Sequence, residues 1–170
     1  MKILAVDSSS LTASAAVVND GKIVAEFFVN AGLTHSETLA TMIKSVLDCS
    51  AVKPKDIDLY AVTVGPGSFT GLRIGLSTVK AMALANNKPC VGVSSLYALA
   101  LNTDKSDKTV CACMDARRGG VYNAVFDVKN GKIIRKTQDR AIYVEDLIAQ
   151  LRNLNNVVQF VGDGGVICYN

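Results

Sequence analysis

The sequence predicts an α/β protein built from two related halves, each with a mixed β-sheet. Three features recur in the same order in both halves: a hydrophobic strand that ends in an aspartate, an Asn/Asp-Gly hairpin signal and a glycine-rich loop. They occur at Asp7 and Asp115, at 20–21 and 130–131, and at 65–67 and 162–165. The order strand, strand, strand, helix, strand and glycine loop is therefore present twice, with little residue identity between the copies.

In the first half, residues 2–6 predict a buried strand that ends at Asp7 and a run of three serines. Residues 12–18 and 22–29 predict two further strands joined by a tight hairpin. A capping box at 34–37 then starts a helix that extends to about residue 51. The core side of this helix is expected to consist of Leu39, Ile43, Val46 and Leu47.

His35 is the single histidine of the chain, and it lies at the start of this helix. It is a candidate catalytic base, but a histidine at a helix start more commonly caps the helix or packs on the surface. A metal site would need a second imidazole, which the sequence does not contain.

The most informative stretch follows a β-branched strand at 59–64. Pro66 fixes one φ angle, while Gly65 and Gly67 allow a sharp turn with exposed amides, and Thr70 is the expected N-cap of the next helix. Amides at a helix start can bind phosphate. The alternative is a structural turn, because the loop matches neither G-x-G-x-x-G nor a Walker sequence.

The helix after this loop is apolar on two sides, which predicts packing against a second element or another chain. Its expected core face is Leu72, Leu76, Val79 and Ala83, and its second stripe is Gly71, Gly75, Thr78 and Met82, flanked by Ile74. The preceding helix carries an uncharged stripe of Thr38, Met42, Ser45 and Cys49. If the two stripes lie side by side, they form a partner interface.

Residues 90–93 predict a short strand and 95–101 a short helix, followed by a polar linker at 102–108. We therefore expect subdomains at 1–103 and 108–170. The second contains predicted strands at 110–114, 121–128, 132–136 and 157–161 and a helix at 144–154. We expect it to be incomplete at the C-terminus, without the helix that follows the glycine loop in the first half.

Composition excludes several classes of protein. A hydrophobic content of 49% in 170 residues supports a sizeable core, and a net charge of +3 does not indicate a nucleic-acid binder. Five cysteines without a C-x-x-C pair favour reduced thiols over disulfides or zinc. The start of the chain shows no signal peptide and no apolar run reaches membrane-spanning length, so a cytoplasmic protein without a membrane association is expected.

The duplicated unit with an aspartate after each first strand resembles the ribonuclease H-like fold of actin, Hsp70 chaperones and sugar kinases. A more specific resemblance, to the TsaB (YeaZ) family, covers nearly the whole chain. It rests on Gly65-Pro66-Gly67-Ser68-Phe69-Thr70-Gly71-Leu72-Arg73, together with Asp7-Ser8-Ser9, His35-Ser36-Glu37 and Asp115-Ala116-Arg117-Arg118.

This resemblance implies a role in making threonylcarbamoyladenosine, the modified base beside the anticodon of tRNAs that read codons starting with A. The chain would be a non-catalytic scaffold for a TsaD-like enzyme, with a TsaE-like ATPase as a third component, and a homodimer without its partner. It would have no cofactor of its own, since ATP and metal belong to the TsaD-like partner, and it would meet tRNA only through the complex. Asp7, Ser8, Ser9, Asp115, Arg117 and Arg118 would be the remnant of a nucleotide cleft.

Two alternatives remain: a nucleotide-binding or ATP-hydrolysing actin-like protein, and a glycoprotease-like peptidase. TsaD-like enzymes carry a metal-binding H-x-x-x-H after the helix that follows the glycine loop, but residues 93–99 here read Val-Ser-Ser-Leu-Tyr-Ala-Leu. Nucleotide-binding proteins of this fold have glycines beside the aspartate at the strand end, which let the backbone reach the phosphates. Here three serines follow Asp7, and Ala116, Arg117 and Arg118 follow Asp115. Arg117 and Arg118, with Arg73, either contact tRNA phosphate within the complex or form an ordinary solvated turn.

Overall fold

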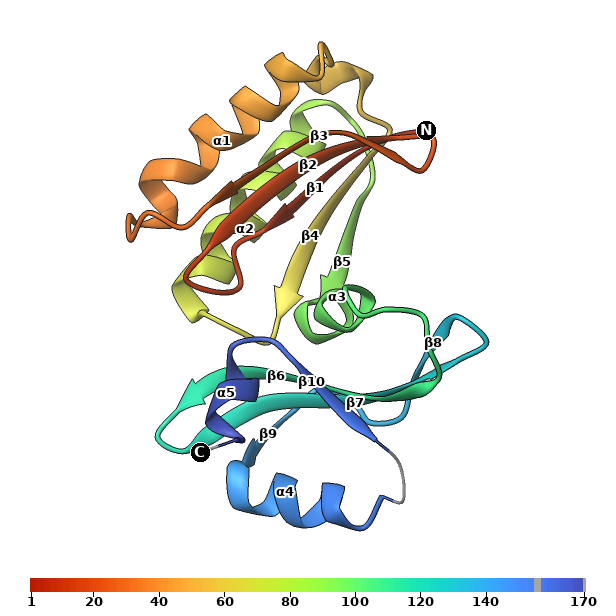
Figure 1. The fold of residues 1–170 in the computed structure, drawn as a ribbon. Helices are drawn as coiled ribbons and strands as arrows, with labels where there is room; N and C mark the ends of the chain where they lie inside the picture. Colours follow the sequence, from red (N-terminus) through yellow and green to blue (C-terminus); the bar gives the residue numbers. More distant parts are fainter. Residues whose placement is uncertain (155–156, 170) are drawn as a thin grey trace. The chain divides into compact units, whose positions relative to one another are not determined.

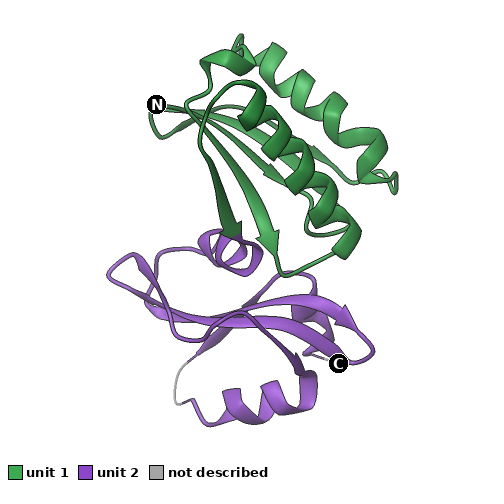
Figure 2. Cartoon of the chain, turned by 180° about the vertical axis from the view of Figure 1, so that it is seen from behind, with its two compact units in different colours: residues 1–93 green, residues 94–170 purple. Residues whose placement is uncertain are grey.

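The computed structural model describes residues 1–154 and 157–169. The chain forms two compact units, residues 1–93 and 94–170 (Figure 2). The division falls between Val93 and Ser94, earlier than the predicted linker, because the short helix α3 (Ser95–Leu101) packs on strands of the second unit. Within the described ranges, no helix is long and apolar enough to cross a membrane.

The first unit is a five-stranded mixed sheet with two long helices on one face (Figure 1). The strand order is β3-β2-β1-β4-β5, in which β1 runs antiparallel to β2 and parallel to β4. Its elements are β1 (Lys2–Asp7), β2 (Ala13–Asn19), β3 (Lys22–Val29), α1 (His35–Cys49), the 3₁₀ helix η1 (Pro54–Asp56), β4 (Leu59–Gly65), α2 (Phe69–Ala85) and β5 (Cys90–Ser94).

Helix α1 begins where the capping box predicts. The backbone amide of Thr34 donates to a Glu37 carboxylate oxygen at 3.0 Å, and the Thr34 side chain accepts from the N3 backbone. The Thr34 hydroxyl also donates to this carboxylate at 2.6 Å, and this bond, followed by the bond from the Thr34 amide, lowers the pKa of Glu37. The predicted core side of α1 is confirmed, because Leu39, Ile43, Val46 and Leu47 are all buried.

The second unit repeats this sheet topology. Its order is β10-β6-β7-β8, with β6 antiparallel to β7 and parallel to β10, and β9 pairs with β7. After α3 its elements are β6 (Lys108–Arg117), β7 (Gly120–Lys129), β8 (Lys132–Arg135), β9 (Arg140–Tyr143), α4 (Val144–Arg152), β10 (Val158–Val161) and α5 (Gly164–Ile167). The predicted duplication is therefore present in strand order and direction.

Strand β6 is buried on both faces, which is why its sequence is a continuous apolar run. Val110, Ala112 and Met114 point into a core with α3, while Cys111 and Cys113 point into a second core with α4. In the first unit, by contrast, α1 and α2 share one core cluster on the same face of the sheet.

Two elements of the second unit differ from the sequence prediction. Strand β9 was not predicted, because its four residues lie between the predicted strand at 132–136 and the predicted helix at 144–154 and were assigned to no element. A helical turn, α5, follows the glycine loop of the second unit where no helix was expected, and Asp163 Oδ1 caps it by accepting from the amide of Gly164 at 2.9 Å.

Candidate functional site

The loop between β4 and α2 is the sharp turn that its glycines predict. Gly65 and Gly67 have φ angles of 114° and 153°, and the Gly65–Pro66 peptide bond is cis. The helix begins earlier than expected: Ser68, rather than Thr70, is the N-cap, and its hydroxyl accepts from the amide of Gly71 at 3.2 Å. The prediction of Thr70 as N-cap was wrong because either residue type caps well and the turn ends two residues sooner.

The turn that follows β1 fills the space beside this loop. The Ser68 amide donates to the carbonyl of Ser9 at 2.7 Å, and the Ser8 hydroxyl donates to the carbonyl of Gly71 at 2.9 Å. Ser8 and Ser9 are buried. A backbone amide that the phosphate-loop hypothesis offered to an anion is therefore bonded to the chain itself.

The side chain of Asp7 stabilises the serine turn through hydrogen bonds. Its Oδ1 accepts from the amide of Ser9 at 2.8 Å and from the hydroxyl of Thr63 at 2.7 Å. Thr63 is buried on β4, and the sequence analysis did not single it out. A polar residue inside an otherwise apolar strand is the signal that could have found it.

His35 closes the same cluster from α1. Its Nε2 lies 2.9 Å from the carbonyl oxygen of Ser10, and a carbonyl can only accept, so this ring nitrogen carries the proton. The role of His35 here is to tie the start of α1 to the serine turn. This agrees with the packing alternative.

Three glycines of the region are contact points with this turn. A Cβ placed on Gly67 would clash with Ser9 O, one on Gly71 with Ser8 O and the His35 ring, and one on Gly75 with the Ser8 hydroxyl. Gly71 and Gly75 are buried against Ser8, in the turn that follows β1. Their prediction as part of an exposed stripe was therefore wrong, because a residue without a side chain gives no periodic signal of the face it lies on.

The remaining motif residues are exposed at the start of α2. The guanidinium of Arg73 lies 3.7 Å from the centroid of the Phe69 ring, and Phe69 is 68% exposed. Ser68 and Thr70 are also exposed, whereas Leu72 is half-buried. The motif thus combines internal glycines with an outward-facing aromatic and cation.

The other predicted cleft residues belong to the second unit. Asp115 Oδ1 accepts from the amide of Arg117 at 2.6 Å, and the Asp115 amide lies 3.3 Å from an Asp163 oxygen. Asp115, Arg117 and Arg118 are exposed. The glycine loop of this unit lies against β6, because a Cβ on Gly162 would clash with Cys113 O.

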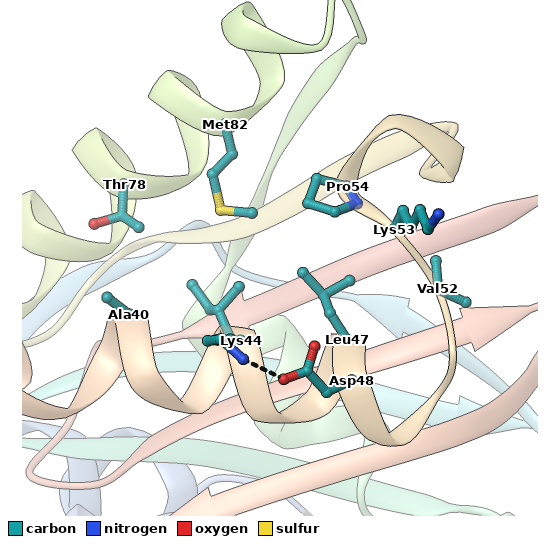
Figure 3. A pocket seen from close by; sticks show the side chains of 10 residues that line it. Ala40, Lys44, Leu47, Asp48, Val52, Lys53, Pro54, Thr78 and Met82 are labelled. Carbon is teal, nitrogen blue, oxygen red and sulfur yellow. Dashed lines mark hydrogen bonds and ion pairs between the residues drawn. The ribbon is translucent and has the colours of Figure 1, made fainter.

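A groove of about 400 Å³ lies between α1 and α2 (Figure 3). Its floor is apolar, and its rim carries Lys44, Asp48 and Lys53, with Lys44 and Asp48 paired across one helical turn. It is lined by Ala40, Ile43, Lys44, Leu47, Asp48, Val52, Lys53, Pro54, Thr78 and Met82.

The two predicted stripes do not lie side by side. Thr78 and Met82 face the groove from α2, but the flank of α1 that meets them is that of Ala40 and Lys44. At about 100° per residue, Thr38, Ser45 and Cys49 lie about 140° around α1 from that flank. Met42 is only 4% exposed and belongs to the core, and Ile74 packs partly against the same core.

Three thiols gather in the second unit. The sulfurs of Cys111 and Cys113 lie 3.5 Å apart, and the buried Asn123 side chain donates to Cys111 at 3.1 Å. The hydrogen bond with Cys111 and then burial raise the pKa of Cys113, and burial raises that of Cys168 to about 11. Among the described residues, no group of three or more potential ligands is arranged to hold a metal.

Comparison with known proteins places this geometry in a family. The model of the family described as TsaD, tRNA N6-adenosine threonylcarbamoyltransferase, matches residues 29–161. A tRNA N6-adenosine threonylcarbamoyltransferase of Geotalea uraniireducens is 36% identical over 124 residues, 62% of this chain and 36% of that protein.

A longer match is to the Bacillus subtilis protein named tRNA threonylcarbamoyladenosine biosynthesis protein TsaB. It is 33% identical over 162 residues, which are 95% of this chain and 71% of the relative. The solved structure of YeaZ from Pseudomonas aeruginosa superimposes with a TM-score of 0.79 at 23% identity, over 95% of this chain and 84% of the other. The actin-like fold predicted from the duplication is confirmed, and the chain belongs to the TsaB (YeaZ) family.

Proposed function

We propose that this chain is the non-catalytic subunit of a complex that installs threonylcarbamoyl on the adenosine next to the anticodon of tRNAs reading A-starting codons. The Bacillus subtilis relative, which matches 95% of this chain, is named for biosynthesis of that modified base. In this proposal a TsaD-like subunit carries the ATP, the metal and the chemistry, and a TsaE-like ATPase is the third component. This chain contributes a surface rather than a reacting group.

The observation that carries the proposal is the filled loop. The carbonyl oxygen of Ser9 accepts a hydrogen bond from the Ser68 amide, and the buried serine turn lies against Gly67, Gly71 and Gly75. The motif glycines thus support close packing of the chain on itself, which favours a structural role over phosphate binding. Asp7, the residue that a nucleotide cleft would need, is likewise bonded to Ser9 and Thr63.

The proposed contact surface is the face of α1 and α2 around the groove. A TsaD-like partner shares sequence with this chain, so it can present an equivalent pair of helices. Two such pairs related by an approximate two-fold axis form a four-helix contact. A second copy of this chain could occupy the same surface when the partner is absent.

A substitution that tests this surface has to lie on the outer side of α2. Gly75→Arg cannot test the interface, because Gly75 faces Ser8 and not the outside. Ala81 is exposed on α2, about 60° around the helix from Thr78 and away from the core, so arginine there leaves the fold intact. We expect Ala81→Arg to weaken association with the TsaD-like partner by about 2 kcal/mol or more.

The test is co-purification with the TsaD-like partner, followed by an assay of modified tRNA with each component left out. Ala149→Arg, at an exposed helical alanine of the second unit, is the matched control and should bind normally. Undiminished binding by Ala81→Arg would show that the interface lies elsewhere on the molecule. Steady ATP turnover by the chain alone, abolished by Asp7→Ala, would favour the ATPase alternative, and cleavage of protein substrates would favour the peptidase.

A further inference from the structure

The hairpin between β6 and β7 differs from the other two tight hairpins of the chain in one residue. All three have two-residue turns with positive φ angles at both positions. The first positions are Asp20, Asn130 and Arg118, with φ angles of 48°, 51° and 53°, and each is followed by a glycine. Aspartate and asparagine tolerate this backbone conformation, whereas arginine does not favour it.

A second arginine beside it is also left-handed. Arg117 has a φ angle of 67° at the irregular pairing between β6 and β7. Two successive arginines in this conformation cost free energy that residues tolerant of positive φ angles, such as asparagine or glycine, would not cost. The local fold therefore does not account for their presence.

Neither arginine side chain is used inside the described part of the chain. Arg117 and Arg118 are exposed, and no side-chain hydrogen bond or ion pair joins them to residues 1–154 or 157–169. By contrast, Arg73 stacks on Phe69, and Arg135 and Arg140 donate to side chains of their own unit. The two hairpin guanidinium groups are available to a ligand.

An exposed aromatic ring lies beside the arginines. Gly120 pairs with Arg117 on one side and with Tyr143 on the other, so the three residues form a row across β6, β7 and β9. Tyr143 is 67% exposed, and two strand spacings separate it from Arg117 by about 10 Å. The residue between them is a glycine, and the side chain nearest to the position of its missing Cβ is the small methyl group of Ala116, at 4.0 Å.

Nearby carboxylates limit the positive field to the hairpin tip. Asp115 precedes the arginines, and Glu145 and Asp146 lie in the first turn of α4, whose Val144 amide donates to Gly119 O at 3.1 Å. Such a mixture is unsuited to a broad electrostatic surface. It suits one or two phosphates held at a defined place.

We propose that this hairpin binds an RNA strand, with Arg117 and Arg118 on phosphodiester groups and Tyr143 stacked on a base. Exposed arginines next to an aromatic ring are the combination that unstacked RNA requires. The proposal rests on the proposed function, since that function supplies the RNA as tRNA held by the complex. It assigns to this subunit a direct contact with the substrate.

The decisive variant is Arg118→Asn, because fold and function should respond in opposite directions. Asparagine favours the turn, so the melting temperature should rise. Removal of one phosphate contact should weaken tRNA binding three- to tenfold and lower the slope of log affinity against log salt concentration by about 0.7–0.9. Arg118→Lys should retain the salt dependence, and Tyr143→Ala should weaken binding where Tyr143→Phe does not.

Binding is measured with unmodified tRNA, both for the chain alone and for the chain with its TsaD-like partner. A rise in melting temperature with wild-type tRNA affinity and salt slope in both settings would overturn the proposal, as would full competition by ATP, which would assign the hairpin to a nucleotide. Failure of the wild-type chain to co-purify with the partner would instead count against the proposed function. The titration of the chain alone with tRNA would still decide whether the hairpin binds RNA.

Discussion

The two units use the same aspartate turn for different purposes. Asp7 is the last residue of β1 and Asp115 lies two residues before the end of β6, and each accepts, through Oδ1, the amide two residues later. After Asp7 the chain is buried under α2, whereas after Asp115 it projects into solvent. The two units therefore share the local turn, but only the turn after Asp7 is covered by a helix.

The cause of this difference lies in where the glycines contact the sheet. In the first unit Gly67, Gly71 and Gly75 meet the serine turn beyond β1. In the second, Gly162 and Gly164 meet Cys113 and Met114, which lie within β6 before the turn. A short displacement of the contact leaves the second turn free, so a duplicated motif need not keep a duplicated role.

The largest effect is expected from Gly71→Val. Its Cβ would clash with the Ser8 carbonyl, which is backbone and cannot move aside, so the free energy of unfolding should fall by more than about 3 kcal/mol. Denaturant titration followed by circular dichroism measures this loss. Gly119→Val is a comparison in a turn where a Cβ meets nothing within 4 Å, although its φ angle of 75° still adds backbone strain.

Asp7→Ala should have the next largest effect. It removes two hydrogen bonds to a carboxylate and leaves the buried Thr63 hydroxyl without its acceptor, a loss of about 2–3 kcal/mol. The midpoint of urea unfolding checks this. A variant as stable as the wild type would show that the serine turn holds its place without Asp7.

The matching change in the second unit, Asp115→Ala, should cost only about 0.5–1 kcal/mol. Asp115 is exposed, and its loss leaves the Arg117 amide with access to water. The comparison with Asp7→Ala under identical conditions is the direct test. Equal losses would mean that the two turns are equally important for stability.

The smallest effect should appear only in alkaline solution. The pKa of Cys168 is about 11 in the folded chain against an ordinary value of 9.0, and that of Cys113 is also raised. The unfolded chain therefore loses thiol protons first, and the free energy of unfolding should fall as the pH rises from about 9 towards 11. Urea titrations across this range measure the slope, which Cys168→Ala should flatten.

Much of the architecture could be predicted from local sequence. The Asp20-Gly21 and Asn130-Gly131 hairpins lie where their residues demand positive φ angles, and the Thr34–Glu37 capping box starts α1. The buried leucines, isoleucine and valine of α1 followed from helical periodicity. In each case the determining residues are neighbours in sequence, so the signal needs no knowledge of distant partners.

The position of the proposed partner surface depended on the tertiary structure. Periodicity assigned Gly71 and Gly75 to an exposed stripe, but both pack against Ser8, which is distant in sequence and lies in the turn after β1. Glycine has no side chain by which a pattern could report its face. The RNA-binding proposal for the arginine hairpin likewise depends on β9, which was not predicted from the sequence. Pairing of β7 with β9 brings Tyr143 beside Gly120, and no local sequence pattern encodes a contact between residues so far apart in the chain.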